Sequence, residues 1–261
     1  AINPKFFDAY KAIGNIHRNS KRYKEAINAY NKYLQKFPKN ADVRYQLGMA
    51  FWSLRKYKEA ILSYKNTLEI DPSDEEARLW LGMTYSSISK YKEAIEEFEI
   101  YTNSNNENSF AYQNYGNALF LNKEYEEALK KLRIALEIKP NNFVSRVILS
   151  KVYGRLNKPS DQIKELKTVL KNNPKYLGIH KELADAYFDK KKYKLAIKEF
   201  NKHLETNKKD TRSIYYIARA YQNLNKIPDA IDTLKAGIET DPNYQSFYHE
   251  LGLIYDKLGR Y

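Results

Sequence analysis

The side chains that could perform covalent or acid–base chemistry are not spaced for it. The chain contains no cysteine, and its four histidines (His17, His180, His203 and His249) stand in unrelated sequence contexts. It has no glycine-rich phosphate loop, no His-Glu-x-x-His segment and no nucleophile elbow. The sequence therefore predicts no catalytic residue, no cofactor and no metal ligand, which is typical of a protein that is not an enzyme.

Other side chains are suited to binding chemistry. Both tryptophans and both methionines of the chain lie within one short stretch, at Met49, Trp52, Trp80 and Met83. Tryptophan dominates many protein interfaces, and the flexible methionine adapts to varied partner shapes. Whether these residues face a partner or a core depends on the elements that carry them.

Those elements belong to a tandem repeat. Prolines occur at positions 38, 72, 140, 174 and 242, and every gap is a multiple of 34 residues. This period divides the chain into seven units at 7–40, 41–74, 75–108, 109–142, 143–176, 177–210 and 211–244, followed by a half unit at 245–261. Residues 1–6 are then the tail of a preceding unit. A fixed period of this length is the signature of a repeat architecture.

Small and aromatic residues recur at fixed places in the units. Unit position 8 is glycine in five units, as at Gly48 and Gly82, and position 20 is alanine in six, as at Ala60 and Ala94. Position 11 is usually tyrosine or phenylalanine. This pattern resembles the tetratricopeptide repeat, whose signature runs Trp, Leu-Gly, Tyr, Ala, Phe and Pro at fixed offsets.

The resemblance implies an all-α, right-handed solenoid of helix-turn-helix units, in which the first helix of each unit (helix A) lines the concave side. In the third unit we expect helix A over about 75–87 and helix B over about 91–101. Proline ends helix B because the residue before it avoids the α region. Gln162 replaces the small alanine in the fifth unit, so we expect that helix pair to open. One pair cannot bury its apolar stripe alone, so the units must stack into one continuous solenoid.

The helical register predicts which residues line the groove. At 100° per residue, unit positions 4, 7, 8 and 11 share the packing side of helix A, and positions 2, 5, 6, 9, 12 and 13 share the opposite side. The predicted peptide-binding groove is therefore lined by Lys11, Asn15, Arg18, Tyr45, Met49, Trp52, Leu79, Trp80, Met83, Phe110, Gln113, Asn114, Asn117, Phe120, Lys151, Arg155, Lys181, Tyr215 and Arg219. The alternative is that the apolar members pack against a neighbouring helix A or a segment outside this chain.

The groove predicts a protein or peptide partner with an apolar centre and acidic flanks, because its ends are mainly basic. Some relatives of this family grip a C-terminal carboxylate with Lys and Asn side chains. Lys11 and Asn15 match the first pair of that clamp, but Gln46, Glu76 and Trp80 depart from the rest, so we expect no such clamp.

Two rival functions remain open from the sequence. The net charge of +13 suggests a nucleic-acid binder, with groove aromatics stacking on bases. Against this, the third unit carries seven acidic and three basic residues, which interrupts the positive track that phosphates favour. The second rival is a regulatory or substrate-recruiting repeat domain of a larger enzyme.

No apolar run is long enough to span a bilayer and no leader is visible, which slightly favours the cytoplasm without fixing a compartment. We expect the chain to be a section of a longer protein. The last helix lacks its helix B, so we expect it either to cap the solenoid or to support end-to-end self-association.

Overall fold

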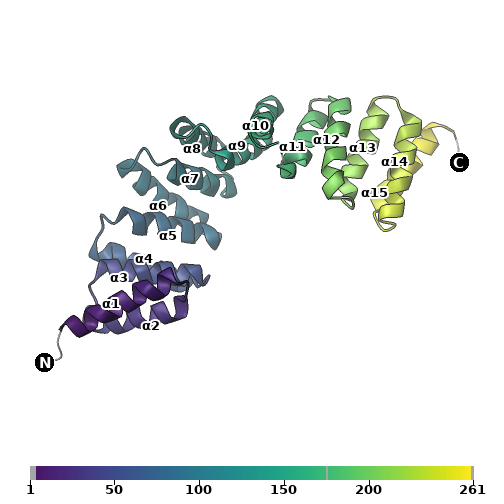
Figure 1. Ribbon diagram of the computed structural model, residues 1–261. Helices are drawn as coiled ribbons and strands as arrows, with labels where there is room; N and C mark the ends of the chain where they lie inside the picture. Colours follow the sequence, from purple (N-terminus) through teal and green to yellow (C-terminus); the bar gives the residue numbers. More distant parts are fainter. Residues whose placement is uncertain (1–3, 175, 260–261) are drawn as a thin grey trace. The chain divides into compact units, whose positions relative to one another are not determined.

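The computed structural model describes residues 4–174 and 176–259, and it is built from paired α-helices (Figure 1). The helices A are α1 (Pro4–Asn19), α3 (Ala41–Ser53), α5 (Glu75–Ser87), α7 (Ser109–Leu121), α9 (Phe143–Arg155), α11 (His180–Asp189), α13 (Thr211–Asn223) and α15 (Gln245–Lys257). The helices B are α2 (Tyr23–Lys36), α4 (Tyr57–Ile70), α6 (Tyr91–Ser104), α8 (Tyr125–Ile138), α10 (Pro159–Asn172), α12 (Tyr193–Thr206) and α14 (Ile227–Thr240). A 3-10 turn, η1 (Leu177–Ile179), precedes α11.

The predicted all-α solenoid of helix-turn-helix repeats is confirmed, and no β-strand occurs in the described residues. Two boundaries differ from the prediction. Residues 4–6, assigned to the tail of a preceding unit, form the first turn of α1, and α6 continues to Ser104. Within the described chain, none of the helices combines the length and the apolar character that crossing a bilayer requires.

The helices gather into two compact units, each made of several of the 34-residue repeats. Unit 1 ends at Ser145 and unit 2 begins at Arg146. In unit 1, each helix from α1 to α8 packs against the next along the chain, and two neighbouring pairs of helices A, α1 with α3 and α5 with α7, also touch directly. In unit 2, α10 to α15 pack in the same sequential manner. The division falls in the fifth repeat, which departs most from the pattern.

Close approach of the two helices in a pair explains the small residues of the pattern. A Cβ atom on Gly48 would lie 2.6 Å from the ring of Tyr64, which is itself fully buried. Ala60 and Ala94 on the facing helices have no exposed surface. Gln162 is also buried, and its amide lies beside Gly154, where a Cβ atom would be 3.1 Å from the amide nitrogen. The opening of this helix pair stays a prediction.

The turn between helices A and B has the same backbone in every unit. In all seven repeats, the residue two places before helix B has a left-handed backbone, with φ between 53° and 69°. None of these seven residues is glycine. In the first turn, for example, the N–H of Arg22 donates to the carbonyl of His17 at 2.8 Å. This conformation reverses the chain so that helix B returns along helix A.

Asparagine and aspartate start several helices A. The side chains of Asn40, Asp74, Asn108 and Asn142 accept backbone N–H bonds from the first turns of α3, α5, α7 and α9. Such caps satisfy N–H groups that have no partner within the helix.

Candidate binding faces on helices A

Most of the predicted groove residues are half-buried or exposed on the helices A. On α3 and α5, unit positions 3, 7, 8 and 10 are buried, as at Val43, Leu47, Ala77 and Leu81. The exception among the predicted apolar residues is Leu79, which is only 5% exposed. We therefore correct the prediction for Leu79: it belongs to the core, because its position lies at the edge of the packing face.

An aromatic and methionine cluster crosses from α3 to α5. We call it the Trp–Met patch, and it consists of Tyr45, Met49, Trp52, Trp80 and Met83, all half-buried. The rings of Trp52 and Trp80 meet edge to face with centroids 5.0 Å apart. The indole N–H of Trp52 has no hydrogen-bond acceptor.

Tyr45 connects this patch to the buried core. Its ring lies 6.0 Å from that of the buried Tyr64, and the Trp80 indole faces its hydroxyl. Burial, reinforced by the carboxylates of Glu76 and Asp74, raises the pKa of Tyr45 to about 12.

The patch continues toward α7 as a mixed surface. Phe110 and Leu121 are 47% and 41% exposed, and the amides of Gln113, Asn114 and Asn117 are half-buried. Phe120 is half-buried against Tyr125, with ring centroids 5.9 Å apart. A cavity of about 550 Å³ opens beside Phe110, lined also by Gln113, Ile138 and Val144.

The polar residues of α1 are engaged within the protein. Lys11 forms an ion pair with Asp42 at 2.7 Å, and Asn15 accepts a hydrogen bond from Tyr30 at 2.8 Å. Burial alone would raise the pKa of the Asp42 carboxyl, but the hydrogen bond from Lys11 helps to hold it below its usual value. Arg18 donates to its neighbour Asn19 at 3.1 Å. Of the two cations predicted for this part of the groove, Lys11 is therefore already paired within the protein.

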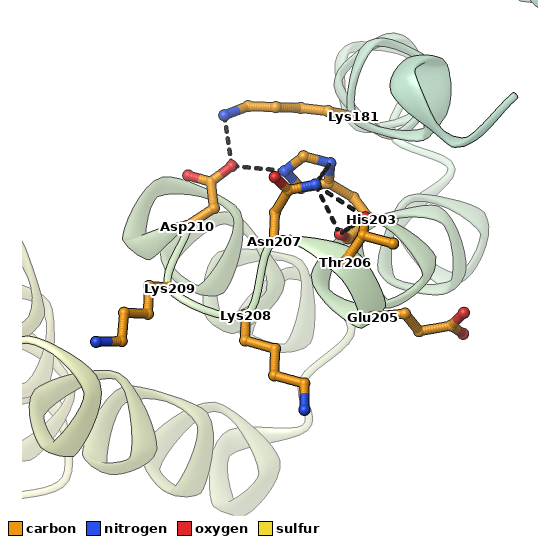
Figure 2. Close-up of a pocket in the computed structure, with 8 residues that line it drawn as sticks. All are labelled: Lys181, His203, Glu205, Thr206, Asn207, Lys208, Lys209 and Asp210. Atoms are coloured by element: carbon orange, nitrogen blue, oxygen red, sulfur yellow. Dashed lines mark hydrogen bonds and ion pairs between the residues drawn. The ribbon is translucent and has the colours of Figure 1, made fainter.

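In unit 2, one predicted groove residue belongs to an ion-pair network. Lys181 donates to Asp210 at 2.6 Å, and the His203 ring contacts the same carboxylate at 2.9 Å (Figure 2). Burial would raise the pKa of the Asp210 carboxyl, but hydrogen bonds from Lys181, Ser213 and His203 outweigh it and lower that pKa to about 2. These residues border a cavity of about 660 Å³.

Lys151 and Arg155 lie exposed on α9, apart from these networks. The two other predicted residues, Tyr215 and Arg219, lie on α13 in an aromatic cluster. Tyr215 donates to Glu250 at 3.1 Å, and Arg219 lies over the Tyr215 ring.

Phe188 and Tyr216 complete this cluster, with ring centroids 5.1 Å apart. Both stand at groove positions of the register, but the prediction did not include them. The register alone could have found them. In the described residues no group of histidine, cysteine or carboxylate side chains is arranged to hold a metal ion.

Comparison with protein families agrees with this architecture. Models described as "Tetratricopeptide repeat" match residues 3–41, 11–75, 45–108 and 149–210, and further models of the same description match 109–142 and 212–244. The chain belongs to the tetratricopeptide repeat family. Membership makes it, in general terms, a protein-interaction scaffold with a typically non-catalytic fold.

Several solved structures share this fold at low sequence identity. A tetratricopeptide repeat protein from Parabacteroides merdae aligns with a TM-score of 0.68 and 14% identity, covering 95% of this chain and 98% of its own. The pilF protein of Pseudomonas aeruginosa gives 0.64 and 22%, covering 81% and 96%. MamA from Desulfovibrio magneticus RS-1 gives 0.63 and 19%, covering 66% and 96%. Comparison with curated protein sequences finds no match.

Proposed function

We propose that this tetratricopeptide repeat chain is a non-catalytic scaffold that binds a protein segment across the helices A of repeats 2 to 4, within a multiprotein complex. The observation that supports this is the Trp–Met patch on α3 and α5. Its tryptophans pack against each other rather than into the core, while Leu79 and the residues at positions 7 and 8 already fill that core.

The chemistry of the patch suits an apolar peptide segment. A half-exposed cluster of aromatic and methionine side chains is unfavourable in water and marks an interaction surface. The half-buried indole rings and methionine side chains offer apolar contact area to such a segment. A partner that covers these side chains would gain free energy by removing them from water.

The partner's predicted acidic flanks receive less support from unit 1, since Lys11 is already paired with Asp42. The same internal pairing weakens the rival role in nucleic-acid binding, which needs several unpaired cations along one track. The remaining rival, a recruiting domain of a larger enzyme, uses the same face and differs only in what the partner does.

The experiment that tests the proposal is a pull-down from a nuclease-treated lysate of the source organism. Wild type is compared with a Trp52→Ala/Trp80→Ala/Met83→Ala variant and with a Leu62→Ala control, which removes the side chain that is 61% exposed on α4. We expect a protein that wild type and control retain and the triple variant loses. Equal capture by all three chains, each checked for folding by circular dichroism, would contradict the proposed site.

A further inference from the structure

The guanidinium of Arg219 is held between two aromatic rings on the helix-A side of unit 2. Its central carbon lies 5.9 Å from the ring centroid of Phe188 and 5.8 Å from that of Tyr215. These distances are within the range of cation–π attraction. Arg219 itself is half-buried, so the contact orders its long side chain before any ligand arrives.

Both rings are themselves fixed. Phe188 packs edge-on against Tyr193 and Tyr216, with centroids 5.3 and 5.1 Å away. The hydroxyl of Tyr215 donates to Glu250 at 3.1 Å. The arginine therefore has a defined orientation on α13.

The charge of Arg219 has no counter-charge bound to it. Among the described residues, no carboxylate forms an ion pair with its guanidinium and no acceptor takes its N–H groups. The nearby Glu250 is engaged, because its two carboxylate oxygens accept hydrogen bonds from Tyr215 and Gln222 at 3.1 and 3.0 Å.

The other cations of this face differ from Arg219. Lys181 is paired with Asp210 at 2.6 Å. Arg212 lies over the Tyr216 ring at 5.6 Å and is attracted by the Asp185 carboxylate, whose pKa burial raises. Arg219 is thus distinguished by being both ordered and unpaired.

A guanidinium is planar and carries its N–H donors in that plane, where they match the two oxygens of a carboxylate. We infer that Arg219 binds an aspartate or glutamate side chain of a protein segment that docks on the helices A of unit 2. The inference rests on the proposed function, since it assumes that the helix-A faces bind protein, and it adds an acidic requirement that the Trp–Met patch does not impose. A nucleic-acid backbone is a poorer match, because one unpaired cation cannot follow a row of phosphates.

The test is a selection of random linear peptides displayed on phage against the whole chain. Wild type, Arg219→Gln, Arg219→Lys and Lys235→Gln are panned in parallel, and Lys235→Gln removes an equal charge from an exposed position on α14. We expect wild type and Lys235→Gln to enrich peptides with an acidic residue at a fixed place, and Arg219→Gln to lose that enrichment. Arg219→Lys keeps the charge without the planar fork, so it should enrich acidic residues more weakly.

The best acidic peptide then serves as the probe in calorimetric titrations. Changing its acidic residue to the amide, or Arg219 to Gln, should weaken binding about 10-fold each, and the two changes together should weaken it little further. Acidic enrichment that survives Arg219→Gln, or peptides selected without an acidic residue, would overturn this inference and leave the proposed function standing. A wild-type chain that selects no peptide at all would contradict both.

Discussion

The indole rings of Trp52 and Trp80 meet edge to face, with centroids 5.0 Å apart, although they stand in different repeats. One lies near the end of α3 and the other in the middle of α5, so the contact exists only when the two repeats are stacked. The candidate binding face is therefore a product of the solenoid and not of a single helix pair. Loss of repeat stacking should disrupt the face and the core together.

The left-handed turn residue predicts a simple way to stabilise the protein. Lys123, between α7 and α8, has φ of 69°, where a side chain is strained and glycine is not. We expect Lys123→Gly to raise the free energy of unfolding by about 0.5–1 kcal/mol, measured by urea denaturation. Asn225→Gly should gain less, because asparagine tolerates this conformation; a loss of stability in Lys123→Gly would contradict the account of the turn.

The lowered pKa of Asp210 predicts an acid-sensitive contribution to the stability of unit 2. A carboxyl whose pKa falls from about 3.9 when unfolded to about 2 when folded stabilises the fold above pH 4, and this contribution disappears as pH falls toward 2. Asp210→Asn should cost on the order of 2 kcal/mol at neutral pH and flatten the loss of melting temperature between pH 4 and 2.

The control for this experiment is Asp232→Asn, which neutralises an exposed carboxylate on α14. It should leave both the neutral-pH stability and the acid dependence close to those of wild type. Equal acid profiles for wild type and Asp210→Asn would show that the network of Lys181 and His203 contributes nothing.

The exposed apolar side chains of the last helix lead us to predict self-association. On α15 and just after it, Tyr248, Leu253 and Leu258 are 49%, 43% and 45% exposed. Covering such a surface with a second copy would stabilise an end-to-end dimer. We expect wild type to associate as its concentration rises in analytical ultracentrifugation, and Tyr248→Glu/Leu258→Glu to stay monomeric.

A Leu62→Glu variant provides the matched control, because Leu62 is exposed on α4 and does not belong to the last helix. It should associate as wild type does. A wild-type chain that stays monomeric at all concentrations would argue that α15 acts as a cap.

The sequence was sufficient for the fold because each repeated residue has a local physical task. Proline stops helix B, and the small residues at Gly48 and Ala60 permit the close approach that the structure shows. The register also kept both tryptophans out of the fully buried core, and both are half-buried in the structure. It erred at Leu79 because a residue at the edge of a helical face can turn either way, and neighbouring helices decide the outcome.

The pairings between repeats could not be predicted in the same way. Lys11 and Asp42, or Lys181 and Asp210, meet across about one full repeat, and their side-chain directions depend on how the repeats stack. One kind of pairing does follow the repeat pattern of the sequence. Arg78 and Arg146 stand where the signature begins with tryptophan, at unit position 4, and each pairs with a glutamate nineteen residues later, which joins helix A to helix B.

The central claim is that the Trp–Met patch contacts the partner. Both tryptophans of the chain lie in this patch, so tryptophan emission reports on it alone. The measurement is the emission spectrum of the whole chain during titration with the protein captured in the pull-down, or with a tryptophan-free segment of it, alongside calorimetry. We predict a shift of the emission to shorter wavelength that saturates with the calorimetric binding curve. Saturable calorimetric binding with an unchanged emission spectrum would contradict the claim and place the partner elsewhere on the solenoid.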